Sequence, residues 1–396
     1  MSAPGSRGAD AGVGIQGGEA LTVLPTGPDQ HDFDTVILGG GIVGLFTALQ
    51  LARTGQSVAV LDQGDIWTEA SAVNAGSLGV QNKLPALVPL SLWSWELWQE
   101  LQAGFGIDAH VKRPGGYKVA MTEDEAERLR DTAEQQARLG ATIEILTRQQ
   151  ISDRAPWLSP DVVAATFSPQ DGFASPTLMG PALAQAAKQA GANIFPHHPA
   201  HAIEPGPRPR IETSHGRFRG TRLAITTGAW TQNAGAMLGI NLPVSLDVNM
   251  VTVTEPAPFT MQGLVSHARG ILTLKQAVNG SCLIGGGWQG IGTLADRRKD
   301  VDYDQMIQNI RLALRVVPGL AGLNALRSWA GYEGVTPDSM PYLGSLPGHP
   351  DIFVAACARG GFTLGPAMAR LLTEVMTGQE SSRPIDLFDP ARFHDA

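Results

Sequence analysis

The residues whose spacing points most clearly to chemistry are Gly39-Gly40-Gly41-Ile42-Val43-Gly44, which match the pattern G-x-G-x-x-G. In this pattern the first glycine permits a tight turn, the second lets the backbone approach a pyrophosphate, and the third lets a helix pack closely on a strand. A helix beginning at Ile42 and Val43 would turn its unpaired N–H groups toward phosphates. Asp62 follows Gly39 by 23 residues, close to the ~20 expected for an acid that binds a free ribose 2′-hydroxyl. The run therefore predicts a dinucleotide site.

The elements needed to hold this turn flank it on both sides. Residues 35–38 are apolar and β-branched, as in a buried parallel strand. Residues 42–54 have helical periodicity, and Gly55 follows them in the place of a C-cap. Residues 57–61 form a second apolar segment. Together they predict one strand–helix–strand unit with the glycine run at its first turn.

A small, polar, glycine-containing segment follows the second strand, at residues 69–78. Such a segment can lie against a flat ring system and supply backbone N–H groups to it. The same composition suits an ordinary loop, and the segment alone does not decide between the two. Its residues of interest are Ser71, Asn74, Ala75, Gly76, Ser77 and Leu78.

Glycine-rich segments near the C-terminus predict a second anion site. Residues 329–338 read WAGYEGVTPD, and residues 353–366 read FVAACARGGFTLGP and open a helix. A helix N-terminus after a glycine turn favours negative charge. A redox ring that becomes negative when reduced would be stabilised there.

Composition indicates an ordinary globular protein and excludes several functions. Of 396 residues, 43% are hydrophobic and 17% are charged, and the net charge is −8. An acidic chain without a basic run is a poor nucleic-acid binder. Cys282 and Cys357 build no disulfide framework, and His197, His198 and His201 lack further ligands, so no metal is expected. With no apolar run long enough to span a membrane and no secretory signal pattern, we expect a cytoplasmic location.

These patterns predict an α/β fold with two domains. One is a Rossmann-like nucleotide-binding domain built from discontinuous segments. The other is a mixed-sheet α+β substrate domain, indicated by short β-type segments in the middle of the chain. The expected limits are 32–90, 150–230 and 330–396 for the first domain, 91–149 and 231–329 for the second, and 1–31 for a flexible N-terminal extension.

Several motifs in order make the chain resemble the FAD-dependent D-amino-acid oxidase-like (DAO) family, in its glycine oxidase and sarcosine oxidase branch. Besides the first glycine run, an S-x-x-N-A-G loop at 71–76, T-G-A-W at 227–230, T-P-D-x-x-P-x-x-G at 336–344 and G-F-T-x-G-P at 361–366 match the family. The resemblance covers roughly residues 34–378 and implies bound FAD. Further positions implied for FAD are Ala200 (at the adenine), Thr227, Gly228, Trp230, Gly331, Arg359, Gly360, Gly361, Phe362, Thr363 and Leu364.

The chain departs from this family at a position that bears on substrate. Many relatives place an arginine that binds the substrate carboxylate two residues after the glycine equivalent to Gly331. Here that position is Glu333, preceded by Tyr332. Glu333 cannot pair with an anion, but it suits a substrate ammonium or the orienting of a neighbour. Tyr332 and Glu333 are therefore the expected catalytic residues.

Two further departures concern the flavin. The covalent-flavin cysteine of monomeric sarcosine oxidases would fall near Gly331, so we expect non-covalent FAD. No lysine stands at the position of the oxygen-activating lysine of that branch, near Leu283 and Ile284, which favours a dehydrogenase over a fast oxidase. The pattern W-x-G-x-E-G at 329–334 resembles the flavin β subunits of D-opine dehydrogenases and hydrogen cyanide synthase. Those subunits work with partners, so a partner subunit or a homo-oligomer is left open.

The resemblance implies oxidation of the C–N bond of a small-molecule amine. The substrate would be a D-amino acid, an N-substituted glycine or another secondary amine of the sarcosine, proline or opine type. Hydride would pass from its α-carbon to the flavin, giving an imine that hydrolyses. One rival is a FAD-dependent 2-hydroxy-acid dehydrogenase, which the missing arginine disfavours. Another is a flavin subunit of a larger dehydrogenase complex that is inactive alone.

Overall fold

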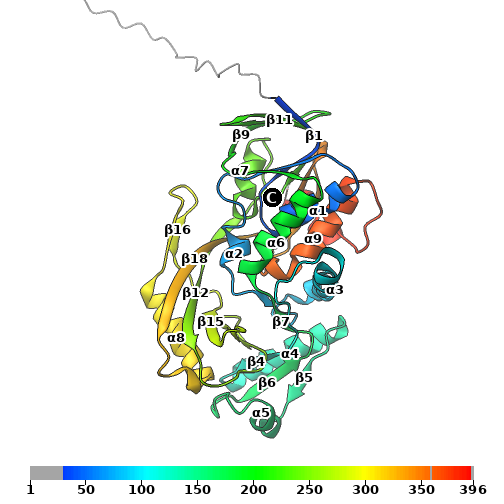
Figure 1. Cartoon of the computed structure of the whole chain (residues 1–396). Coiled ribbons are helices and arrows are strands. Elements are labelled where there is room, and N and C mark those ends of the chain that lie inside the picture. The colour runs from blue at the N-terminus through cyan, green and yellow to red at the C-terminus, as the bar shows by residue number, and fades with distance from the viewer. Residues whose placement is uncertain (1–29, 357–358, 394–396) are drawn as a thin grey trace, which may run out of the picture.

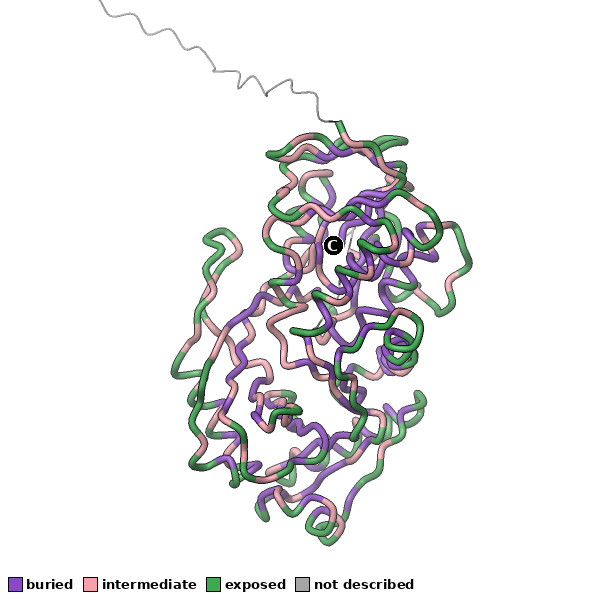
Figure 2. Tube along the Cα trace, viewed as in Figure 1, coloured by how far each residue is buried: buried purple, intermediate pink, exposed green. Residues whose placement is uncertain are grey.

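The computed structural model describes residues 30–356 and 359–393, which form two lobes (Figure 1). Each lobe is built on one eight-stranded sheet, and buried residues follow the interior of both lobes (Figure 2). Most of the expected extension at 1–31, together with Cys357, lies outside the described residues.

The first sheet carries the glycine-rich turn. Its strands are β1 (Gln30–Leu38), β2 (Val58–Leu61), β8 (Asn193–Phe195), β9 (Ala200–Glu204), β10 (Arg210–Thr213), β11 (Gly216–Ile225), β19 (Tyr342–Leu346) and β20 (His349–Ala356). The main order is β19-β20-β11-β1-β2-β8, parallel from β20 to β8, with β19 antiparallel at the edge. Because β1 lies between β11 and β2, the turn after it opens at the carboxyl ends of parallel strands, where α/β folds bind ligands.

Four helices cover one face of this sheet. They are α1 (Ile42–Arg53), α3 (Val88–Phe105), α6 (Pro176–Gln189) and α9 (Gly361–Met376). The sequence of α1 is apolar nearly all round, as expected for a helix buried between a sheet and its neighbours. In α3, the Trp95 and Trp98 indoles donate to the carbonyl oxygens of Leu78 and Thr363, both at 3.1 Å. These tryptophans therefore pack α3 onto the nucleotide lobe.

The second sheet is mixed and belongs to the other lobe. Its strands are β4 (Gly116–Ala120), β5 (Glu144–Leu146), β6 (Ala164–Ser168), β12 (Ser245–Pro256), β13 (Leu264–His267), β14 (Thr273–Gln276), β15 (Ser281–Gly285) and β18 (Ala325–Val335). The order is β18-β12-β15-β14-β13-β4-β6-β5, and only the β13–β4 pair is parallel. The helices of this lobe are α4 (Glu123–Arg138), α5 (Arg148–Arg154) and α8 (Tyr303–Val316).

Short elements join and cover the two sheets. No helix in the described ranges is long and apolar enough to cross a membrane. The short elements are α2 (Ala70–Val73), β3 (Ser77–Leu78), β7 (Gly172–Phe173), α7 (Thr231–Ala236), β16 (Ile291–Thr293), β17 (Arg298–Asp300), and 3₁₀ turns at Pro85–Leu87, Gly228–Trp230, Pro318–Leu320, Asp386–Phe388 and Pro390–Phe393.

The packing of three parts of the structure differs from the expected domain limits. Helix α3 was expected in the substrate domain but packs on α9 in the nucleotide lobe. Strands β5 and β6 pair in one ladder of the second sheet, although the limit at 150 separates them. Strand β18 crosses the limit at 330 because it pairs with β12 along nearly its whole length. The limits themselves remain a proposal.

The buried Lys275 of β14 gives a prediction about stability. Its side chain is 4% exposed, its Nζ donates to the carbonyl oxygen of Ala174 at 3.1 Å, and burial lowers its pKa from 10.5 to about 7. Between these values the unfolded chain binds more protons than the folded one, so stability rises with pH. We expect Lys275→Met to be more stable than the wild type at pH 7, and this gap to shrink by about 2 kcal/mol by pH 9. Unfolding free energies at both pH values test this, and a constant gap would contradict it.

Candidate active site

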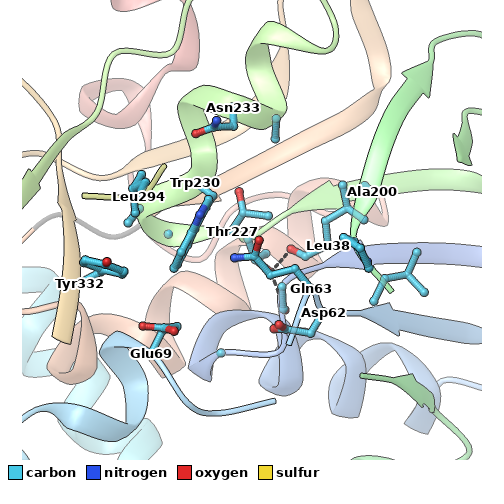
Figure 3. A pocket seen from close by; sticks show the side chains of 18 of the residues that line it. Leu38, Asp62, Gln63, Glu69, Ala200, Thr227, Trp230, Asn233, Leu294 and Tyr332 are labelled. Carbon is cyan, nitrogen blue, oxygen red and sulfur yellow. Dashed lines mark hydrogen bonds between the residues drawn. The ribbon is translucent and has the colours of Figure 1, made fainter. Parts of the chain in front are cut away.

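A cavity of about 690 Å³ opens beside the glycine-rich turn (Figure 3). Its walls come from the ends of β1 and β2, the loop before β9, and the segment that follows β11. It thus lies where the fold predicts a nucleotide. Of the residues predicted to bind the cofactor, it brings together Gly39, Gly41, Asp62, Ser71, Ala200, Thr227, Gly228 and Trp230.

The conformation of the turn requires glycine at its first and last positions. Gly39 has φ +102°, and a Cβ there would lie 2.6 Å from the carbonyl oxygen of Thr226. A Cβ on Gly44 would lie 2.0 Å from the carbonyl oxygen of Gly39. Gly44 lines neither of the cavities described here, so its role is to let α1 approach the strand. Gly41 lies on the wall, where backbone can approach a ligand.

Asp62 is fixed at the edge of this cavity by two backbone donors. Its Oδ2 accepts from the Gly40 N–H at 2.7 Å and its Oδ1 from the Gly64 N–H at 3.0 Å. Burial raises the pKa of Asp62, although these two hydrogen bonds oppose the shift. Each oxygen keeps acceptor capacity beyond the one bond it makes, so the carboxylate is suited to hold ribose hydroxyls.

The β16–β17 hairpin closes one side of the same cavity. Leu294 and Arg297 of its loop line the cavity, and the guanidinium of Arg297 donates to Oε1 of Gln63 at 3.2 Å. Lys299 forms an ion pair with Glu69 on the opposite rim. Two interactions therefore hold the hairpin across the cavity beside the glycine-rich turn.

Tyr332 makes a third tie between the hairpin and the body of the protein. It lines both cavities, but its hydroxyl donates to the carbonyl oxygens of Thr293, at 2.7 Å, and Arg298. Burial, with Glu69 and Asp296 nearby, raises the pKa of Tyr332, which keeps the hydroxyl protonated. Because that proton is engaged by the hairpin, the geometry argues against the expected catalytic role of Tyr332 and for a positioning role.

Tyr332→Phe distinguishes these roles. Loss of one buried hydrogen bond costs about 1 kcal/mol, so we expect FAD to dissociate about 5-fold faster while kcat changes less than about 3-fold. Stopped-flow transfer of FAD to an apoflavoprotein measures the first quantity, and steady-state assays measure the second. A fall in kcat of about 100-fold or more, with FAD retention unchanged, would restore the catalytic role.

A second cavity of about 400 Å³ continues from the first toward the mixed sheet. The two share Gly41, Ser71, Gly228 and Tyr332 on their walls, so a long ligand can occupy both. We call the second one the ring-end cavity. Of the predicted residues it brings together Ile42, Val43, Asn74, Ala75, Ser77, Gly331, Glu333, Arg359, Gly360, Gly361, Phe362 and Thr363, besides those shared with the first.

The loop after β2 is shaped by its own polar side chains. The Ser71 Oγ accepts from the Ile42 N–H at 2.9 Å, which joins the loop to the start of α1. Asn74 donates to the carbonyl oxygen of Ala70 at 2.8 Å and accepts from the Gly76 N–H at 2.7 Å. The Asn74 side chain therefore folds the loop, which then presents its backbone to the cavity.

Three other predicted residues lie behind the ring-end cavity instead of on its wall. A Cβ on Gly76 would lie 2.2 Å from the carbonyl oxygen of Ala174, so this glycine permits a close backbone approach. Leu78 and Leu364 have no exposed surface and belong to the core. Neighbouring positions in a motif alternate between wall and core, which the motif pattern itself does not reveal.

The ring-end cavity has features that fit a flavin. Helices α1 and α9 both begin on its wall, at Ile42 and Gly361, and their N-termini favour negative charge. The buried Ser77 Oγ lines the cavity without a hydrogen-bond partner among the described residues, so the polar edge of a ring can satisfy it. Cys282 is fully buried and lines neither cavity, and Gly331 stands where the covalent cysteine was sought.

Glu333 lies on the wall of the ring-end cavity, as expected. Its Oε1 accepts from the Gly360 N–H at 2.9 Å, and its Oε2 accepts from the amide of Asn249. Burial raises the pKa of Glu333, while the Gly360 N–H, Arg359 and Lys83 lower it and Asp247 raises it. The net direction is upward, so this carboxylate is a titratable acceptor inside the cavity.

Sequence reasoning missed several polar residues of the ring-end cavity, namely Lys83, Lys118, Asn249 and Arg269. Lys118 had a signal, because it is the one charged residue in the apolar strand GYKVA. The buried Lys275 was also missed. It faces Leu283 across the β14–β15 ladder, beside the position where a lysine was sought, but it lines neither cavity. In the described ranges no three His, Cys, Asp or Glu residues are grouped to hold a metal.

A Rossmann-like lobe whose cavity leads to a mixed-sheet lobe defines a two-domain, dinucleotide-dependent oxidoreductase. The family model described as "DAO: FAD dependent oxidoreductase" matches residues 34–375, and the chain belongs to this family. Its cofactor is FAD.

Similar proteins agree with this assignment over nearly the whole chain. Glycine oxidase of Geobacillus kaustophilus is 30% identical over 374 residues, covering 92% of this chain and 96% of that protein. One subunit of the opine oxidase of Rhizobium meliloti is 29% identical over 377 residues, covering 92% and 98%. Among solved structures, the G. kaustophilus glycine oxidase superimposes with a TM-score of 0.85 at 29% identity and covers 91% of this chain and 99% of that one. The L-proline dehydrogenase of P. horikoshii has a TM-score of 0.84 at 26% identity, covering 92% and 98%.

Proposed function

We propose that this FAD-dependent oxidoreductase oxidises the C–N bond of a small amine, with the substrate nitrogen held at Glu333. The observation that carries the proposal is the Glu333 carboxylate on the wall of the ring-end cavity. Bound FAD supplies the hydride acceptor. The chain itself has to place the substrate α-carbon against the ring and keep water away.

In this proposal Glu333 positions the substrate by binding its nitrogen. Two donors from different elements, the Gly360 N–H and the Asn249 amide, hold the carboxylate still. Gln289 in turn donates to Oδ1 of Asn249 at 3.0 Å, which fixes the orientation of that amide. A substrate N–H group would donate to the remaining lone pairs of the carboxylate.

The names of the similar proteins support an amine substrate. Glycine oxidase, opine oxidase and L-proline dehydrogenase are each named for a compound that contains an amine. A D-configured substrate is a further proposal, and so is the action of the enzyme as a dehydrogenase and not as a fast oxidase. Because the similar opine oxidase has more than one subunit, a partner chain is also proposed. Non-covalent attachment of FAD and a cytoplasmic location are proposals too. For the attachment, acid precipitation of the holoenzyme should leave all FAD in the supernatant.

A 2-hydroxy-acid dehydrogenase is a second candidate that one observation favours. The missing arginine counted against it, but Lys83, Lys118 and Arg269 line the ring-end cavity and can attract an acid. Glu333 favours the amine, because a carboxylate beside a hydroxyl gains less than one beside an ammonium.

Product analysis with an artificial electron acceptor tests the proposal. Secondary and primary amino acids are assayed beside 2-hydroxyglutarate. For an acyclic amino acid, C–N oxidation at the α-carbon followed by hydrolysis of the imine predicts one oxo acid and one amine or ammonia for each two electrons passed on; for proline the nitrogen stays in the same molecule, as a cyclic imine or its ring-opened form. Turnover of the hydroxy acid alone, with an oxo acid and no nitrogen product, would replace the proposal with its rival.

A further inference from the structure

Two buried lysines line the ring-end cavity and have no part in the binding of the substrate nitrogen proposed for Glu333. Lys83 and Lys118 both line the cavity and are only 8% and 9% exposed. They come from separate elements, Lys83 from the loop between β3 and α3 and Lys118 from β4. Each lysine has an acid of the protein within electrostatic range, Glu333 for Lys83 and Asp171 for Lys118, and two ammonium groups on the wall of one cavity also favour an anionic ligand there.

A buried amide network holds both lysines in place. Lys118 Nζ donates to the backbone oxygen of Gln81 at 3.1 Å. The Gln136 amide of α4 donates to the same oxygen at 3.1 Å and to the backbone oxygen of Lys83 at 2.7 Å. Gln81 and Gln136 are each 1% exposed. Through the Gln81 oxygen and the Gln136 amide, the loop that carries Lys83 is therefore connected to the ammonium group of Lys118.

Asp171 holds the same loop through hydrogen bonds. Its carboxylate accepts from the Val80 N–H at 2.6 Å, from the Gln81 N–H at 3.3 Å and from the Gln81 amide at 2.9 Å. Burial lowers the pKa of Lys118, but the charge of Asp171 opposes that shift. Burial also raises the pKa of Asp171, against its hydrogen bonds and the charge of Lys118, so each of these two groups partly offsets the effect of burial on the other.

One residue, Gly360, links Lys83 to Glu333. The Gly360 N–H donates to Glu333 at 2.9 Å, and its carbonyl oxygen accepts from Lys83 Nζ at 3.1 Å. Lys83 and Glu333 therefore bind the two backbone polar groups of one residue, Gly360, just before α9.

We propose that Lys118 and Lys83 form the binding site for the substrate carboxylate, replacing the arginine that is absent at Glu333. The inference rests on the proposed function, because it takes the nitrogen to lie at Glu333. The substrates are then amino acids or N-substituted amino acids, and amines without an acid are excluded. The arginines near the mouth are less suited, since Arg359 pairs with Asp247 and is half exposed, and Arg269 is exposed.

Acetate binding tests the site without turnover. We expect acetate to perturb the visible spectrum of the oxidised holoenzyme in a saturable way, and Lys118→Met and Lys83→Met each to weaken acetate about 10-fold or more. The control Lys275→Met removes a buried lysine of the same sheet that lines neither cavity, and should keep the response. Inorganic phosphate is titrated in parallel. No saturable acetate response in the wild type, tighter binding of phosphate, or equal weakening in all three variants would overturn the proposal.

Kinetics separate this inference from the proposed function. For an amino acid that the enzyme oxidises and its carboxamide, the wild type should prefer the acid by about 10- to 100-fold in kcat/KM. Lys118→Met should remove that preference, mainly through KM for the acid, and change the carboxamide less than about 3-fold. An equal loss for both compounds would show a structural role. If only hydroxy acids react, the proposed function fails, while the acetate titration still decides whether the lysines bind carboxylate.

Discussion

Replacing Glu333 with glutamine should lower kcat/KM for every accepted amine by about 10- to 100-fold. Glutamine keeps the size of the side chain and can accept from the Gly360 N–H, but it has no charge to pair with a substrate ammonium. Charge-assisted hydrogen bonds contribute about 1.5–3 kcal/mol, which sets the expected range. Steady-state kinetics on the FAD-loaded variant measure the loss, and unchanged kinetics would remove Glu333 from the site.

The pH profile gives the same experiment a second readout. Burial raises the pKa of Glu333 above its ordinary value of 4.5. Protonation removes the charge, so kcat/KM of the wild type should fall as the pH drops through this raised pKa. The inflection should disappear in Glu333→Gln. As a control, Glu255→Gln removes a carboxylate from the solvent-facing end of β12, where Glu255 accepts from Asn324, and should leave the profile unchanged.

Gly39→Ala should abolish tight FAD binding, with a dissociation constant raised on the order of 100-fold. An alanine at φ +102° is strained, and its Cβ would lie 2.6 Å from the carbonyl oxygen of Thr226. The strain costs about 1–2 kcal/mol and the overlap about 1–3 kcal/mol. The turn must move to relieve both, which displaces the start of α1 from the phosphate position. Fluorescence titration of the apoprotein with FAD measures the effect.

The chain offers a matched control for this substitution. Gly55 also has a positive φ, +86°, but nothing lies within 4 Å of a Cβ placed there. Gly55→Ala should therefore lose about 1 kcal/mol of stability and keep the FAD affinity of the wild type. Equal weakening of FAD by both substitutions would mean that the close packing at Gly39 is not what shapes the site.

The local parts of the nucleotide site could be predicted from the sequence because they depend on residues close together in the chain. The helix expected at 42–54 is α1 at Ile42–Arg53, and the strand expected at 57–61 is β2 at Val58–Leu61. The glycine run lies between β1 and α1, and Asp62 lies beside it, as the spacing predicts. Strand, turn and helix signals are short-range, so one sequence suffices to read them.

The ring end of the site could not be predicted in the same way, because it depends on long-range packing. The hydroxyl of Tyr332 is engaged by a hairpin that begins some 40 residues earlier in the chain. Lys83 and Lys118 line one cavity although they lie on separate elements, and Gln136 of α4 binds the loop that carries Lys83. Nothing in the sequence around Lys83 marks it as buried. The two sheets cross the expected domain limits for a similar reason, since β18 pairs with β12 and α3 packs on α9, both far away in the chain.

The central claim is that this chain holds FAD which an amine carrying a carboxylate reduces. An anaerobic titration tests it most directly, in which the visible flavin band of the purified holoenzyme is followed as sarcosine, glycine, D-alanine, D- and L-proline, a D-opine or 2-hydroxyglutarate is added. The account predicts that at least one of the amines bleaches the band and that 2-hydroxyglutarate does not. Bleaching by 2-hydroxyglutarate alone, or a chain that takes up no FAD, would contradict it.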